Sequence, residues 1–190
     1  RDELGPSTHH FLARNILPGL GNDGPMGTPQ SSMWQVMRHT YIADIVRKKS
    51  EILQDYTEDH EIQITPEVLL EMATLGGRKH LFLDEQVAGI EKDNSADIII
   101  VDIDNHRFYP HNNLRRIPTH LVFSTDVQDV ESVMIKGQLV VENRKSTIWD
   151  YDEVKNEAEI ATRELLKMAG YEPMLPTRRP GQTFNGWNYS

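Results

Sequence analysis

The spacing of apolar residues along the chain predicts four helices. Apolar side chains recur every three or four positions over residues 31–49 and 150–169, which is typical of helices with one buried face. Shorter helices are predicted over residues 6–15 and from Thr65 onwards. Residues 51–61 are polar and acidic, so we expect a solvated connection there.

The helix that begins at Thr65 has a clear start signal and an ambiguous end. Thr65 can cap the first turn, and Pro66 suits the first helical position because its missing N–H would be unpaired there anyway. The pair Gly76-Gly77 either breaks this helix or lets it pack tightly against a neighbour. Residues 78–83 are expected to form a further helical turn.

Continuous apolar runs predict five short strands. They cover residues 16–21, 96–102, 120–123, 130–135 and 139–142. The run 96–102 is apolar enough for a buried strand, and the last two strands are expected to form a hairpin through Lys136-Gly137. We expect the tail 171–190 to lie over a surface of the protein.

Composition restricts the class of protein. The chain has 190 residues, enough for about one domain, and its 38% hydrophobic and 26% charged residues are typical of globular proteins. A formal net charge of −9 disfavours nucleic acid and anionic membranes as partners. No apolar stretch is long enough to span a membrane. The absence of cysteine excludes disulfides and fits a reducing compartment, so we expect a cytoplasmic protein.

The turn after the first predicted strand is the main candidate for chemistry. Two glycines, Gly19 and Gly21, lead to Asp23, and Gly24-Pro25 follows. In α/β folds, ligands gather at the C-terminal ends of strands, so a carboxylate there suits a metal ligand or a proton carrier. Asp-Gly is also a common turn signal, and the spacing alone leaves both interpretations open.

Other polar and aromatic residues carry weaker signals. His9 and His10 are adjacent in a predicted helix, where neighbouring side chains point about 100° apart, so the pair is poorly placed to share one metal. Trp34, His39 and the loop 26–30 could face a substrate. An aromatic and methionine stripe at helical spacing is more often part of a core.

Three stretches together resemble the C-terminal part of amidohydrolase-superfamily enzymes, in the branch of cytosine, guanine and methylthioadenosine/adenosylhomocysteine deaminases and of chlorohydrolases. Residues 19–24 (Gly-Leu-Gly-Asn-Asp-Gly) resemble the strand-eight signature of that family. Residues 70–79 resemble the helix that follows the barrel, and residues 87–102 resemble the segment that enters a small β-sandwich. The hairpin around Gly137 also matches, so the resemblance covers roughly residues 6–169.

The resemblance implies an α/β fold: the C-terminal part of a metal-dependent (β/α)8 barrel plus strands of a small β-sandwich. Residues 1–85 would hold the last barrel strand and helices, residues 86–145 the sandwich strands, and residues 146–190 a C-terminal helix and tail. Asp23 would be both a metal ligand and a catalytic proton carrier. The implied cofactor is a divalent metal, zinc or alternatively iron, and the implied activity is hydrolytic deamination of an amino-substituted heterocycle, a small-molecule substrate.

The chain also departs from the family pattern. No His-x-His motif is present, whereas the family binds its metal through such a motif on the first strand. One carboxylate cannot hold a catalytic zinc, which needs about three protein ligands. We therefore expect this chain alone to be inactive. It would be a fragment of a longer enzyme, half of a split enzyme that needs an N-terminal remainder, or a degenerate non-catalytic subunit. A third alternative, an independent small α+β binding module, is weakened by the strand count, because a self-contained sheet would need more strands. A homo-oligomeric assembly is a further expectation.

Overall fold

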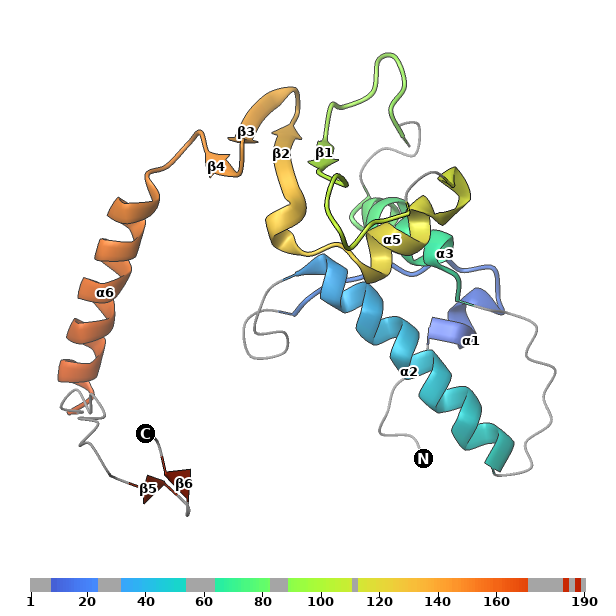
Figure 1. The fold of residues 1–190 in the computed structure, drawn as a ribbon, viewed down its shortest axis with the longest axis horizontal. Coiled ribbons are helices and arrows are strands. Elements are labelled where there is room, and N and C mark those ends of the chain that lie inside the picture. The colour runs from blue at the N-terminus through green and yellow to red at the C-terminus, as the bar shows by residue number, and fades with distance from the viewer. Residues whose placement is uncertain are drawn as a thin grey trace. The chain divides into compact units, whose positions relative to one another are not determined.

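The structure is a computed structural model of the 190-residue chain. It describes residues 8–23, 32–53, 64–82, 89–110 and 113–170, together with the strand residues 183–184 and 187–188. The chain divides into two compact units, residues 1–145 and residues 146–190. Figure 1 shows the elements of both units.

The first unit contains a helical part built around a small apolar core. Its helices are α1 (Thr8–Leu12), α2 (Met33–Leu53), α3 (Pro66–Glu71), the π-helical turn η1 (Met72–Gly76), α4 (Gly77–His80), the short 3-10 turn η2 (Leu114–Arg116) and α5 (Ile117–Phe123). The buried side chains of Met37, Ile64, Leu69 and Val122 form one cluster, because α5 packs against both α2 and α3. This packing brings three helices from distant parts of the sequence together (Figure 1).

The first unit also contains an antiparallel sheet. Its strands, in spatial order, are β1 (Ile98–Val101), β2 (Val130–Ile135), β3 (Gln138–Glu142) and the two-residue β4 (Lys145–Ser146), which lies at the boundary between the units. The 3-10 turn η3 (Val127–Asp129) leads into β2. Lys136 and Gly137 both have positive φ, 49° and 79°, as the tightest hairpin turns require.

The second unit contains the long helix α6 (Tyr151–Met168) and a small antiparallel pair, β5 (Thr183–Phe184) and β6 (Trp187–Asn188). Asp150 caps α6, because its carboxylate accepts hydrogen bonds from the amides of Asp152 and Glu153 at 2.8 and 3.1 Å. Gly170, with a φ of 73°, follows the end of the helix. Across both units, no helix in the described ranges has the length and apolar character that crossing a membrane requires.

Several predicted elements are confirmed. Helices lie at all four predicted places, and the Thr65 hydroxyl accepts a hydrogen bond from the Val68 amide at 3.4 Å, with Pro66 as the first helical residue. The hairpin over residues 130–142 is present. Gly76 and Gly77 do not break their helix, since both have helical backbone angles. Helix α2 extends to Leu53, into the connection predicted for residues 51–61, and residues 54–63 lie outside the described part.

One predicted strand is wrong, because residues 120–123 lie in helix α5. The run His-Leu-Val-Phe favours a strand locally, but Pro118 fits the first turn of a helix. The decisive reason is tertiary: a helix places Val122, which is fully buried, in the core beside Met37 and Leu69. Burial of an apolar helix face outweighs a local propensity that differs by less than about 1 kcal/mol per residue.

Three further predictions about strands and burial differ from what the described residues show. Residues 16–21 form no ladder with any described residue. Strand β1 forms as predicted but is not buried, since Ile99 and Ile100 are 58% and 51% exposed. The sequence predicts a buried apolar stripe on α6, yet no described residue of its unit covers this stripe, and Leu165 is 61% exposed.

Candidate metal-ligand site

Asp23 lies at the end of an irregular segment that follows α1. Its side chain is exposed and its φ is 55°, in the left-handed region that aspartate tolerates better than most residues. No hydrogen bond or ion pair joins the carboxylate to another described residue. Both carboxylate oxygens are therefore available to a ligand. The continuation of the turn, Gly24-Pro25, lies outside the described residues.

The segment before Asp23 is held by the helical stretch that runs from η1 to α4. The Leu20 amide donates a hydrogen bond to the Met72 carbonyl at 3.3 Å. The imidazole Nε2 of His80 lies 3.1 Å from the Leu17 carbonyl oxygen. Between these two contacts, Gly76 packs directly against the backbone of Pro18. This helical stretch therefore fixes the backbone that leads to Asp23.

Asp23 can supply one ligand to a metal ion but cannot form a metal site alone. A carboxylate oxygen is an ordinary ligand for zinc, and a catalytic zinc takes about three protein ligands. Within the described ranges, no three His, Cys, Asp or Glu side chains are close enough to hold a metal ion together. The described residues can therefore supply one ligand, and the others would have to come from elsewhere.

The weaker candidates lie in different surroundings. His9 is buried and His10 is exposed, with ring centroids 6.1 Å apart and planes nearly perpendicular, so the two rings lie in different surroundings. Trp34 is partly buried against the helical core, as expected if the aromatic and methionine stripe is part of that core. His39 is exposed on α2, and the loop 26–30 lies outside the described residues.

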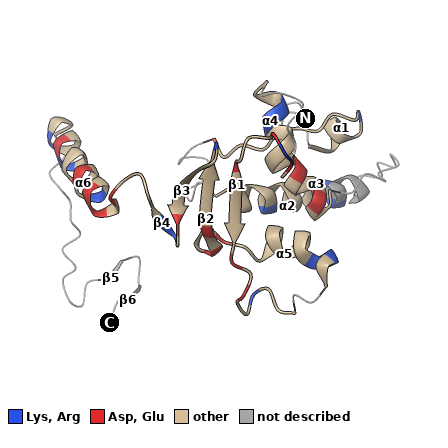
Figure 2. Cartoon of the chain, turned by 90° about the horizontal axis from the view of Figure 1, so that it is seen from above, with Lys and Arg blue, Asp and Glu red and all other residues tan. Residues whose placement is uncertain are grey.

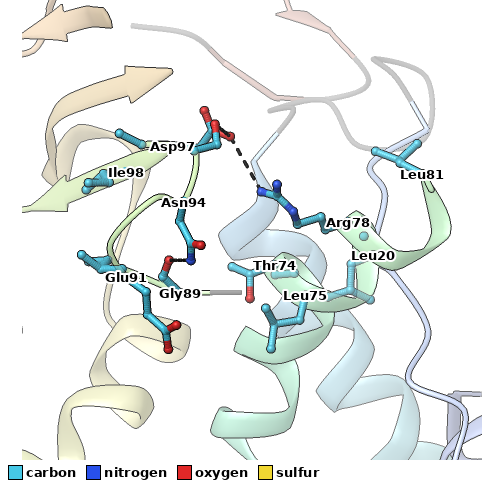
Figure 3. A pocket seen from close by; sticks show the side chains of 15 residues that line it. Leu20, Thr74, Leu75, Arg78, Leu81, Gly89, Glu91, Asn94, Asp97 and Ile98 are labelled. Carbon is cyan, nitrogen blue, oxygen red and sulfur yellow. Dashed lines mark hydrogen bonds and ion pairs between the residues drawn. The ribbon is translucent and has the colours of Figure 1, made fainter. Parts of the chain in front are cut away.

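A separate cavity of about 800 Å³ lies between η1–α4 and the segment that enters β1. Figure 3 shows Leu75 and Arg78 on one side and Asn94 and Asp97 on the other. Asp23 is not among its lining residues, so this cavity and the candidate metal-ligand site are different places. No local pattern in the sequence predicts this cavity, because it forms between segments that come close only through folding.

Asp97 connects the two walls of this cavity. Its carboxylate accepts hydrogen bonds from the Lys136 amide at 2.7 Å and from the Ser95 hydroxyl at 3.0 Å, and the Arg78 guanidinium lies 3.9 Å away (Figure 3). The Lys136 amide bond, followed by the Ser95 bond, lowers the pKa of Asp97 below its usual value of 3.8. The residue therefore stays ionised and anchors the start of β1 to the hairpin turn.

A second polar network stabilises the loop after β1. Buried Asp129 pairs with Arg107 and accepts a hydrogen bond from the Asp126 amide at 2.7 Å. Nearby, Arg144 pairs with Asp102 at 2.7 Å. The Asp104 amide and then Arg144 lower the pKa of Asp102. These charges are internally paired, so they are structural rather than free for catalysis.

Solved structures share this fold. An adenosine deaminase from Xanthomonas campestris with bound zinc matches with a TM-score of 0.68 and 21% identity, over 85% of this chain and 34% of that chain. Atrazine chlorohydrolase TrzN from Arthrobacter aurescens, complexed with zinc, matches with a TM-score of 0.65 and 20% identity, over 80% of this chain and 31% of that one. The fold is thus that of about a third of each of these longer chains.

The chain belongs to the amidohydrolase family, whose pattern it matches over residues 12–140. A 5-methylthioadenosine/S-adenosylhomocysteine deaminase of Thermoanaerobacter pseudethanolicus is 30% identical over 158 residues, which are 83% of this chain and 33% of that protein. A 5′-deoxyadenosine deaminase of Methanobrevibacter smithii is 24% identical over 82% of this chain and 33% of that protein. The chain spans about a third of the length of the curated relatives it matches.

Proposed function

We propose that this chain is the C-terminal third of a metal-dependent aminohydrolase that deaminates an amino-substituted heterocycle of the adenosine type. The observation that carries the proposal is the family match over residues 12–140 together with the similarity to deaminases of 5-methylthioadenosine and S-adenosylhomocysteine. Deamination by water breaks the bond between a ring carbon and its amino nitrogen, adds oxygen to that carbon and releases ammonia.

Asp23 is the residue of this chain that would take part in the chemistry. Its carboxylate, which pairs with no described residue, would provide one ligand to a divalent metal, zinc in the structures that share the fold. Such a metal, when bound, supplies an acidified water at neutral pH. Asp23 would accept a proton on a carboxylate oxygen and deliver it to the leaving nitrogen, which is ordinary general acid–base work for a carboxylate. Iron as the alternative metal stays a prediction from the sequence.

The remaining ligands would come from a preceding part of the enzyme, on the same or a separate chain. Two features of the structure support such a partner. The segment 16–21 forms no ladder with described residues. Strand β1 pairs only with β2 among them, and it carries no charge between Ile98 and Val101, where Figure 2 shows an uncharged ribbon. An edge strand of a folded protein is usually protected by charge or by a covering element.

In this proposal, residues 1–85 complete a (β/α)8 barrel with the missing segment, and residues 86–145 complete a β-sandwich with it. The junction of these parts, near residue 85, lies outside the described residues. Residues 146–190 add the C-terminal helix and tail. A homo-oligomeric assembly and a cytoplasmic location stay predictions from the sequence.

A chimera tests the proposal. This chain would replace the corresponding third of the Thermoanaerobacter pseudethanolicus deaminase, and ammonia release from 5-methylthioadenosine and S-adenosylhomocysteine would be measured together with zinc content. We expect about one zinc per molecule and deaminase activity. A folded, zinc-loaded chimera that releases no ammonia from either substrate, or from adenosine, would contradict the proposed function.

Asp23→Asn tests the role of Asp23 in the same chimera. Asparagine keeps the size and tolerates the left-handed backbone, but it cannot accept the proton, so we expect a fall in kcat of at least about 10²-fold. The matched control is Asp93→Asn, because Asp93 is also exposed and also has a positive φ, 70°. Equal activity of the two variants would show that Asp23 has no catalytic role.

A further inference from the structure

Gly76, the last residue of η1, is in contact with the backbone of the segment that leads to Asp23. A Cβ atom at Gly76 would lie 2.3 Å from the Pro18 carbonyl oxygen, about 1 Å closer than ordinary contact. A Cβ atom at Gly19 would lie 2.9 Å from the Gly77 Cα. Because the contacting atoms are backbone on both sides, no side chain could move aside to make room.

The π-helical turn takes part in the same contact. A turn of π-helix contains one more residue than a turn of α-helix, and such turns are frequent at functional sites. Here the Met72 carbonyl, at the start of the turn, accepts the Leu20 amide at 3.3 Å. With His80 at the Leu17 carbonyl, the stretch η1–α4 contacts the backbone of four consecutive residues, 17–20.

Asp23 comes three residues after the segment 17–20, whose backbone η1–α4 contacts. Because no described residue pairs with the segment as a strand, the contact with η1–α4 is what defines its position in the described structure. We infer that Gly76 is a positioning residue for Asp23: its lack of a side chain lets η1 close onto Pro18 and Gly19 and thereby sets where the Asp23 carboxylate stands. The inference rests on the proposed function.

The expected size of the effect follows from the geometry. In Gly76→Ala, the new Cβ atom must displace the Pro18 backbone by about 1 Å. A displacement of about 1 Å in a catalytic group can cost about 10²-fold in rate. A carboxylate displaced to this extent is also a poorer metal ligand. A substitution at Gly76 should therefore lower both the turnover rate and the affinity for zinc. If Gly76 had a purely structural role, the substitution would change only the amount of folded protein.

The experiment compares Gly76→Ala with Gly77→Ala in the assembled enzyme, meaning this chain with its preceding barrel segment as in the chimera above. Gly77 is the matched control, because it has nearly the same helical angles, with φ of −59° in both residues, and nothing lies within 4 Å of its Cβ position. Both variants gain the same helix propensity. Measurements are kcat and KM per folded molecule and the zinc dissociation constant by chelator competition.

We expect Gly76→Ala to lower kcat by about 10- to 100-fold and to weaken zinc binding, with a smaller change in KM, and Gly77→Ala to stay within about twofold of the wild type. Unchanged kcat and zinc affinity per folded molecule of Gly76→Ala would overturn the inference, even if its Tm fell. If Gly76→Ala does not fold, Gly19→Ala, with its milder clash, decides by the same measurements. An inactive wild-type assembly would instead count against the proposed function.

Discussion

At the scale of single residues, Asp97 shows how one exposed carboxylate can organise two elements. It accepts hydrogen bonds from the Lys136 amide and the Ser95 hydroxyl, and Arg78 on α4 faces it across the cavity. The sequence indicated Asp97 only as part of a motif. Its partners could not be predicted, because Lys136 and Arg78 come close to it only through folding.

The lowered pKa of Asp97 gives a prediction for stability against pH. A carboxylate whose pKa is lower in the folded state stabilises the protein above its unfolded pKa, and this contribution is lost as pH falls through the folded value. Because the folded value lies below 3.8, we expect the loss below about pH 4. The urea midpoint of this chain should therefore fall more steeply from pH 5 to pH 3 than that of Asp97→Asn.

The control for this measurement is Glu142→Gln, an exposed carboxylate with no hydrogen bond to another described residue. The urea midpoint of Glu142→Gln should fall with pH as steeply as that of the wild type. Some slope should remain in Asp97→Asn as well, because the pKa of Asp102 is also lowered. Parallel curves for the wild type and Asp97→Asn would show that the bonds to Lys136 and Ser95 do not stabilise the folded state.

At the scale of elements, helix α5 shows that packing decides between local alternatives. Its sequence is compatible with a strand, but only a helix lets Val122 join the core formed by α2 and α3. Other contacts hold its C-terminal end: Arg38 donates to the Thr125 carbonyl at 3.0 Å, and the rings of Tyr41 and Phe123 meet edge to face at 4.9 Å. These contacts join residues more than 80 positions apart.

The core contact of α3 with α5 predicts a large effect of truncating Leu69. This side chain is fully buried. Leu69→Ala should lower the free energy of unfolding by about 2–5 kcal/mol, because it removes apolar burial and leaves a cavity. Urea unfolding followed by circular dichroism measures the change. The matched control, Leu114→Ala, removes a side chain that is 77% exposed and should cost less than about 0.5 kcal/mol.

The outcome that would contradict this packing is an equal midpoint for the two leucine variants. Leu69 would then contribute no more than a surface side chain. The helical core defined by Met37, Ile64, Leu69 and Val122 would not be what stabilises the first unit.

At the scale of the whole molecule, strand β1 is an uncovered apolar strand in the described part of the chain. Ile99 and Ile100 point to opposite faces of the strand, as neighbours in a strand do, and both are more than half exposed. A chain with such a strand at the edge of its sheet is prone to associate through it. The proposed preceding segment would cover this strand in the complete enzyme.

We therefore expect the separate 190-residue chain to self-associate, and Ile99→Lys to reduce this association by placing a charge on the exposed strand. Light scattering after size-exclusion chromatography measures the mass. Ile42→Lys is the control, because Ile42 is 54% exposed but lies on α2. A monomeric wild type, or an equal effect of both variants, would show that β1 is not the associating surface.

The sequence by itself determined the elements whose signals are local. Helices α2, α3 and α6 follow from the period of apolar residues, and the start of α3 follows from the cap at Thr65. The hairpin follows from its turn at Lys136-Gly137. The order of short motifs also indicated the family, and the match over residues 12–140 confirmed it. For the helices and the hairpin, residues within a few positions of one another carry the information, and for the family the order of the motifs carries it.

Only the tertiary structure decided the features that depend on distant partners. It placed residues 120–123 in a helix, closed Gly76 onto Pro18, joined Asp97 to Arg78 and left β1 uncovered. The sequence indicated Asp23 because a turn aspartate after two glycines is a local signal, and its catalytic role stays a proposal. Burial and close backbone contact are properties of two segments together, and the pattern of either segment alone does not contain them.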